Sequence, residues 1–132
     1  MVDHVDSTLL LSDYADGVLR LTLNDGKRRN ALSSPMLAEL SSAFNRSAED
    51  PKVRVIVLAA NGPVFCSGHD LKEMTAARAE ADKGQAAFQR LFAACADVMQ
   101  LIVRNPKPVI AEVAGVATAA GCQLVASCDL AM

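Results

Sequence analysis

Residues 107–130 constrain the fold of this chain more than any other stretch, because they read as a strand, a turn of small residues and a helix in immediate succession. Pro108 fixes its own φ angle and favours an extended Lys107, so the apolar residues that follow are expected to form a short buried strand ending near Gly115. Residues 117–120 all have small side chains. A ligand could therefore approach the backbone closely where the next helix begins.

A helix that begins at such a turn presents backbone N–H groups without intrahelical partners, together with the positive end of the helix dipole. These groups suit an oxygen that becomes negative during a reaction, so an oxyanion hole is one hypothesis for residues 117–120. The alternative is that the small residues only allow close packing. A transmembrane helix is a third reading, but Glu112, Gln123, two glycines and a proline interrupt the run and no basic flank orients it.

A second turn of small residues lies at 65–74, where Gly68 precedes His69 and a short helix is expected from about Asp70. An oxyanion hole needs two converging donors, and two such turns could supply one N–H group each. The His69 ring could act as a general base, but a lone histidine beside an aspartate in a turn is more often structural. We therefore expect its backbone N–H group, rather than its ring, to contribute.

The remaining sequence alternates between strands and helices, which is typical of an α/β protein. Asp16 and Gly17 between two apolar runs predict a β-hairpin, and the β-branched residues 53–60 predict a central strand. A helix is predicted at 35–45, after a capping Ser34 and Pro35, with a buried stripe. That stripe is expected to comprise Met36, Leu37, Leu40 and Phe44.

A long helix is predicted over residues 76–104, with Gly84 as a point where it could break into two. Its apolar stripe is expected to comprise Phe88, Leu91, Phe92, Cys95, Met99 and Ile102. Residues 129–132 read as the start of a further buried strand that has no partner. The chain therefore looks cut off within a domain.

Charge and cysteine usage limit the partners and the compartment. A net charge of −2 and five aromatic residues disfavour binding to nucleic acid or to an anionic membrane. Four cysteines without a C-x-x-C pair indicate buried free thiols, and no metal site is expected. Asp3 and Asp6 stand where a signal peptide needs a basic region and an apolar core, so a cytoplasmic location is predicted.

Three motifs occur in order along the chain: KRRNAL at 27–32, GPVFCSGHDLKEM at 62–74 and KPVIAEVAGVATAAGCQLVASCDLA at 107–131. Together they resemble the crotonase superfamily of enoyl-CoA hydratases and isomerases, and within it the enoyl-CoA hydratase domain-containing proteins. The resemblance implies an α/β crotonase (ClpP-like) fold built from repeated ββα units, of which the N-terminal part is present. Residues 1–132 would then be the N-terminal part of a single domain, truncated before its second half.

The resemblance also implies a site. The backbone N–H groups of His69 and Ala120 would form the oxyanion hole for the carbonyl oxygen of an acyl-CoA or enoyl-CoA thioester, which is the substrate and not an added cofactor. The three basic residues at 27–29 read either as a solvated loop or as phosphate contacts. The family's contacts to coenzyme A would be carried by Arg29, Ala31, Leu32, Gly68, Asp70, Leu71 and Gly121. A homotrimer or hexamer is implied as well.

Gln123 departs from the family pattern, because hydratases of the family carry a catalytic glutamate there and a neutral amide cannot be a general base. The family's second glutamate would lie beyond Met132. Glu112 and Glu73 are the acids near the two turns, one on a buried-strand segment and one on a solvated helix. The expected function is acyl-CoA binding with an altered acid–base pair. The alternatives are an isomerase or thioesterase with a base outside these residues, or a catalytically silent acyl-CoA-binding or scaffold subunit.

Overall fold

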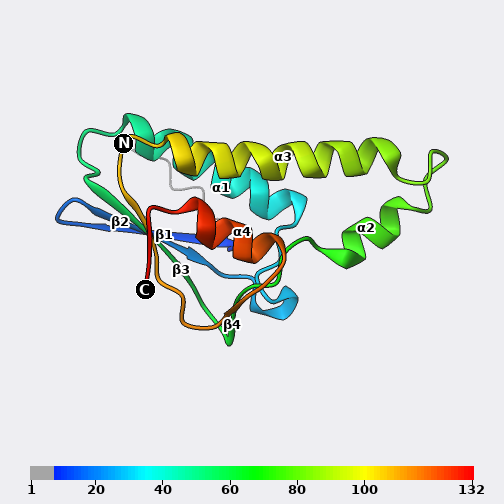
Figure 1. The fold of residues 1–132 in the computed structure, drawn as a ribbon, viewed down its shortest axis with the longest axis horizontal. Helices are drawn as coiled ribbons and strands as arrows, with labels where there is room; N and C mark the ends of the chain where they lie inside the picture. The colour runs from blue at the N-terminus through cyan, green and yellow to red at the C-terminus, as the bar shows by residue number, and fades with distance from the viewer. Residues whose placement is uncertain (1–7) are drawn as a thin grey trace.

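The computed structural model describes residues 8–132, and the N-terminal acids used to predict the compartment lie outside this range. A five-stranded sheet has helices packed against it, and Figure 1 shows α1 and α3 side by side along one side of the sheet. The strands are β1 (Leu10–Ala15), β2 (Val18–Leu23), β3 (Val55–Ala60), β4 (Val64–Cys66), β5 (Val109–Ala111), β6 (Val116–Ala117) and β7 (Leu130–Ala131). The helices are α1 (Ser34–Glu49), α2 (Leu71–Ala77), α3 (Gln85–Arg104) and α4 (Ala120–Ser127), with a 3₁₀ turn at Gly26–Arg28.

The main sheet has the strand order β1-β2-β3-β5-β7. The predicted hairpin is confirmed: β1 and β2 pair antiparallel through Asp16 and Gly17, which both have positive φ angles, 49° and 86°. From β2 onward the pairs are parallel, and β3 is the central strand, as predicted. Because parallel strands end at the same edge, the loops that follow β2, β3 and β5 meet there.

A second, two-stranded sheet joins β4 to β6 in parallel, with Val64 opposite Val116 and Cys66 opposite Ala117. No sequence pattern predicts this sheet, because strands of three and two residues are too short to show one. This small sheet lays the segments that lead into the two small-residue turns beside each other. It is therefore the element that brings those turns together.

Helix α1 begins one residue earlier than predicted. Its N-cap is Ser33, whose side chain accepts a hydrogen bond from the Met36 N–H group at 3.3 Å, while Ser34 is the first helical residue. The helix also continues to Glu49, beyond the predicted end. The expected stripe is confirmed, since Met36, Leu37, Leu40 and Phe44 are all buried.

The long helix is interrupted at Gly84, as predicted. Gly84 has a φ angle of 87° and caps the start of α3, while α2 ends seven residues earlier, at Ala77. The buried side of α3 comprises Leu91, Cys95, Val98, Met99 and Ile102. Phe92, predicted to be buried, is 46% exposed. By length and composition alone α3 could cross a membrane, but this stripe belongs to the hydrophobic core.

The strand predicted at residues 129–132 differs from the expectation that it is buried and has no partner. Strand β7 does have a partner, since Leu130 and Ala131 pair with Ile110 and Ala111 of β5, and it is exposed rather than buried.

The cysteines are free, as expected, but not all of them are buried. Burial raises the pKa of Cys66 to about 11, whereas Cys122 is exposed. An exposed position on α4 was not visible in the sequence because that segment is almost uniformly apolar.

Candidate functional site

The loop that follows β2 runs beside the turn that follows β4. The Ser67 N–H group donates to the Arg29 carbonyl oxygen at 3.1 Å, and the Leu32 N–H group donates to the Gly68 carbonyl oxygen at 2.7 Å. Leu32 and His69 form an isolated parallel bridge. Residues from two of the three sequence motifs are thus held together by backbone hydrogen bonds.

The third motif approaches the same turn from another direction. A Cβ atom at Gly68 would lie only 3.1 Å from the Ala120 nitrogen, and a Cβ atom at Gly121 would lie 2.2 Å from the Cys66 carbonyl oxygen. The Thr118 N–H group donates to the same Cys66 oxygen at 3.1 Å. Gly68 and Gly121 therefore allow the two turns to pack closely, which is what the close-packing interpretation expects of them.

Two backbone donors at this junction have no acceptor in the part of the chain that the structure describes. Within residues 8–132 no hydrogen bond is made by the N–H group of His69 or of Ala120, whereas the N–H group of Gly121 donates to Thr118 at 2.8 Å. Ala119, just before α4, has a φ angle of 53° and a ψ angle of −127°. This conformation is strained for a residue with a side chain, and such strain costs about 1–3 kcal/mol and clusters at functional sites.

The His69 side chain lies against α3. Its ring centroid is 5.2 Å from that of Phe92, with the two rings at 71° in an edge-to-face arrangement. The ring is half-buried, and its Nδ1 atom is buried without a hydrogen-bond partner among the described residues. Burial lowers the pKa of His69 below its ordinary value of 6.5, and the nearby Glu73 carboxylate opposes this only in part.

A lowered pKa in the folded state predicts a pH-dependent stability. Below about pH 6.5 the unfolded chain takes up a proton on His69 more readily than the folded chain, so the unfolding free energy falls as the pH falls through this range. We expect His69→Gln to remove this part of the pH dependence. Urea unfolding of both proteins at pH 7.5, 6.5 and 5.5 measures it. Equal losses of stability in the two proteins would contradict the assignment.

The other predicted site residues differ in their burial and in their contacts. Asp70 caps α2 by accepting hydrogen bonds from the N–H groups of Lys72 and Glu73 at 3.0 and 3.3 Å. Gln123 is exposed on α4, three residues after Ala120 and so on the same side of the helix. The residues Ala31, Leu32, Gly68 and Gly121 are buried at the junction, whereas Arg29 and Leu71 are exposed at its margin.

The three basic residues that precede α1 differ in their surroundings. Arg28 lies 3.6 Å from Asp25 and 4.0 Å from Asp70, so carboxylates already hold its guanidinium group. Lys27 and Arg29 are exposed and form no ion pair among the described residues. Of the three, these two can best meet an anionic ligand.

Asn30 supports the site but was not singled out in the sequence. Its fully buried side chain accepts a hydrogen bond from the Asp25 N–H group at 2.7 Å. Its Nδ2 atom donates to the carbonyl oxygens of Asn61 and Val64, both at 2.9 Å. It thereby ties the loop after β2 to the segment that joins β3 to β4. In the sequence, Asn30 is one polar residue between the basic run and Ala31, and no pattern indicates that its side chain is buried and joins two loops.

Replacing Asn30 by alanine is expected to lower the free energy of unfolding by about 2–4 kcal/mol, because it leaves buried backbone groups without partners. Chemical denaturation of the purified variant measures the loss. Asn45→Ala is the matched control, since the exposed Asn45 side chain bonds, among the described residues, only to Ser41 of its own helix, at 3.0 Å. Similar stabilities of the two variants would show that the Asn30 bonds do not hold the loop.

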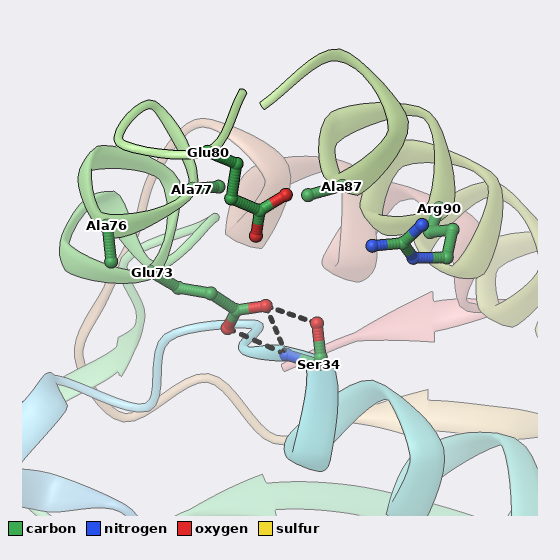
Figure 2. Close-up of a pocket in the computed structure, with 7 residues that line it drawn as sticks. All are labelled: Ser34, Glu73, Ala76, Ala77, Glu80, Ala87 and Arg90. Atoms are coloured by element: carbon green, nitrogen blue, oxygen red, sulfur yellow. Dashed lines mark hydrogen bonds between the residues drawn. The ribbon is translucent and has the colours of Figure 1, made fainter. Parts of the chain in front are cut away.

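Both acids near the turns are engaged elsewhere. Glu112 forms an ion pair with Arg20 at 2.7 Å, and this guanidinium group lowers the pKa of Glu112. Glu73 accepts hydrogen bonds from the backbone N–H group and from the hydroxyl group of Ser34, as Figure 2 shows. These contacts join α2 to the start of α1.

A pocket of about 300 Å³ lies beside this contact, between α2, α3 and the start of α1. In Figure 2 the side chains of Glu73, Glu80 and Arg90 extend toward it from α2, from the segment after α2 and from α3. Its lining consists of Ser34, Glu73, Ala76, Ala77, Glu80, Ala87 and Arg90. None of these is a residue that the sequence predicted for the site, so the pocket neighbours the junction and does not contain it.

Comparison with known proteins agrees with the fold and the three motifs. Residues 13–132 match the family described as enoyl-CoA hydratase/isomerase. The mitochondrial enoyl-CoA hydratase domain-containing protein 3 of Xenopus laevis is 47% identical over 131 residues, which are 99% of this chain and 42% of that protein. The chain thus spans about two fifths of the length of this curated relative.

Solved structures give the same result. The enoyl-CoA hydratase of Mycobacterium smegmatis superposes with a TM-score of 0.87 at 57% identity, over 95% of this chain and 47% of that one. The human enoyl-CoA hydratase domain-containing protein 3 superposes with a TM-score of 0.85 at 44% identity, over 93% of this chain and 47% of that one. The predicted crotonase fold is therefore confirmed for this part of the domain.

The predicted cytoplasmic location is wrong by the same comparison. The curated relatives from Xenopus laevis, Danio rerio and Rattus norvegicus are all named as mitochondrial proteins. A reduced-thiol composition is shared by the cytoplasm and other reducing compartments, so it did not discriminate between them. Together, the family match, the sequence relatives and the superposed structures establish that the chain belongs to the enoyl-CoA hydratase/isomerase family.

Proposed function

We propose that the chain binds the thioester group of an acyl-CoA and that the backbone N–H groups of His69 and Ala120 donate to its carbonyl oxygen. The observation that carries this proposal is the pair of N–H groups that have no acceptor among residues 8–132, on adjoining turns that Gly68 and Gly121 bring together. Fixed donors of this kind favour an oxygen that gains charge, as a thioester oxygen does when an enolate forms. Each donor contributes about 3 kcal/mol of stabilisation to such an oxygen.

The coenzyme A part would lie along the loop after β2 and the start of α2. Ala31 and Leu32 are buried there and their N–H groups already donate to Arg28 and Gly68, so they would shape this part of the site, while Asp70 and Leu71 border the same turn. The exposed Lys27 and Arg29 would meet the phosphates, since neither has a carboxylate partner among the described residues.

Turnover requires more than the two donors. Hydration of a 2-enoyl thioester needs a base to activate water at the β carbon and an acid to deliver a proton at the α carbon. Gln123 could orient a water molecule or a substrate oxygen, but its amide cannot take up the proton. Since Glu112 and Glu73 are engaged elsewhere, such chemistry, or isomerisation or hydrolysis of a thioester, would need a base other than Gln123, Glu112 and Glu73.

A second candidate is a subunit that binds acyl-CoA without converting it. The engagement of Glu112 by Arg20 and of Glu73 by Ser34 favours it, since neither carboxylate is left to replace a glutamate at position 123. Both candidates share the same binding site. They differ only in turnover.

Calorimetric titration with butyryl-CoA and with free coenzyme A tests the proposal. We expect the thioester to bind more tightly than free coenzyme A, since only the thioester has a carbonyl oxygen for the two donors. Loss of the conjugated absorbance of crotonyl-CoA, followed on a sample of verified intact mass, then separates a hydratase from a silent binder. Equal affinity for butyryl-CoA and free coenzyme A would contradict the proposed oxyanion hole.

A further inference from the structure

The pocket beside the junction has one wall from α2 and another from α3. The α2 wall consists of four residues that follow one another at intervals of one to three: Glu73, Ala76, Ala77 and Glu80. This spacing places them on one face of α2 and of the turn that continues it, where the Glu80 N–H group donates to the Ala77 carbonyl oxygen at 3.0 Å. The α2 wall thus carries a carboxylate at each end and methyl groups between them.

The two carboxylates of the α2 wall are not equivalent. Glu73 is held by the Ser34 N–H group at 3.0 Å and by the Ser34 hydroxyl group. Glu80 is exposed, and its side chain forms no ion pair or hydrogen bond among residues 8–132. The Glu80 carboxylate is therefore available to a cationic group in the pocket.

The α3 wall carries a positive charge. Ala87 and Arg90 lie three residues apart on α3 and so share one face of the helix. Arg90 is exposed and forms no ion pair within the part of the chain that the structure describes. The neighbouring Asp82 carboxylate instead accepts hydrogen bonds from the N–H groups of Gly84 and Ala86, at 3.0 and 2.9 Å. The Arg90 guanidinium group is therefore available to an anionic group.

These two unpaired charges face each other. Figure 2 shows the Glu80 carboxylate and the Arg90 guanidinium group extending into the pocket from opposite walls, with the methyl group of Ala87 between them. An anion alone would be repelled by the two carboxylates of the α2 wall, and a cation alone would be repelled by Arg90. A ligand that carries both charges satisfies both walls.

The lining and the size of the pocket restrict the ligand further. A volume of about 300 Å³ is at the lower end for ligand pockets, so the ligand is a small molecule. Among the described residues, no aromatic ring lines the pocket, so it lacks the surface that recognises quaternary ammonium groups. A primary ammonium group, which donates hydrogen bonds to a carboxylate, fits this lining better.

We propose that this pocket binds a small amino acid as a zwitterion, with its ammonium group on Glu80 and its carboxylate on Arg90. Arginine suits this role because its planar guanidinium group can hold a carboxylate through two parallel hydrogen bonds. The alanine methyl groups contact the carbon chain of the ligand. The site shares no residue with the proposed thioester site, so the inference goes beyond the proposed function and does not rest on it.

NMR titration of the ¹⁵N-labelled protein with glycine, β-alanine and 4-aminobutyrate tests the proposal, because these three differ in the spacing between their two charges. We expect saturable shifts in the backbone N–H signals of the pocket residues. The amine and the carboxylate that each keep one of the two charges, such as butylamine and butyrate for 4-aminobutyrate, are the ligand controls. Each should bind at least about tenfold more weakly, since a hydrogen bond between charged groups typically contributes that much.

Two variants assign the contacts. Arg90→Gln and Glu80→Gln should each weaken binding of the zwitterion by at least about tenfold. Arg104→Gln is the matched control, since Arg104 is exposed in the last turn of the same helix, and it should leave the affinity unchanged. Butyrate that binds as tightly as 4-aminobutyrate, with no effect of Glu80→Gln, would indicate a simple anion site and overturn the proposal. Absence of saturable shifts with all three amino acids would overturn it as well, whatever the outcome of the thioester titration.

Discussion

Replacing Gly121 by alanine is expected to lower the free energy of unfolding by about 3 kcal/mol or more. The new Cβ atom would lie 2.2 Å from the carbonyl oxygen of Cys66 and 2.8 Å from its carbonyl carbon. Both are backbone atoms of β4, so neither can move aside as the end of a side chain would. Alanine also favours a helix over glycine by about 1 kcal/mol, which is too little to offset this overlap.

Denaturant unfolding of Gly121→Ala measures the loss, and Gly26→Ala is its control. Gly26 has no atom within 4 Å of the position that a Cβ atom would take and no positive φ angle, so its replacement should leave stability nearly unchanged. A Gly121→Ala variant as stable as the control would mean that α4 does not approach β4 as closely as described. The proposed donor pair would then lose its geometric basis.

Replacing Gly68 by alanine is expected to damage the site more than the fold. Its Cβ atom would lie 3.0 Å from the Ala119 Cβ atom and 3.1 Å from the Ala120 nitrogen, directly beside one of the two donors. Loss of a single oxyanion donor typically lowers turnover by about 100-fold to 1000-fold. We therefore expect any turnover of a thioester to fall by at least about 100-fold, and the preference for butyryl-CoA over free coenzyme A to disappear.

Gly62→Ala separates crowding at the site from backbone strain. Gly62 also has a positive φ angle, 86°, close to the 92° of Gly68, but the nearest atom to its Cβ position is 3.9 Å away. Both variants carry the strain of a positive φ angle, and only Gly68→Ala crowds Ala120. If Gly62→Ala lost the thioester preference to the same extent, general destabilisation and not the donor pair would explain the effect.

Local chemistry predicted the elements whose signals lie within a few residues. Asp16 and Gly17 predicted the hairpin, the β-branched run predicted β3, and Gly84 predicted the break before α3, because each depends on backbone preferences at one place. The cap of α1 was misplaced by one residue, since Ser33 and Ser34 are both good caps and only the structure shows which side chain accepts from Met36.

Long-range features could not be predicted in this way. The pairing of β4 with β6 and the two hydrogen bonds that Asn30 donates to Asn61 and Val64 join segments that are far apart in the sequence. Phe92 was assigned to the buried stripe because it follows the helical period, but it is 46% exposed and its ring contacts that of His69, which comes from a distant turn. The two small-residue turns were recognised as a pair, but the roles of His69, Ala120 and Gln123, the binding of coenzyme A and the trimer or hexamer stay predictions.

The central claim is that two backbone N–H groups, from His69 and Ala120, polarise a bound thioester carbonyl. Infrared difference spectroscopy of butyryl-CoA labelled with ¹³C at the thioester carbonyl measures this directly, because hydrogen bonding weakens the C=O bond. We predict that the carbonyl stretching frequency of the bound ligand falls below its value in water, and that the Gly68→Ala variant loses this shift. A bound thioester whose carbonyl frequency equals or exceeds the value in water would contradict the claim.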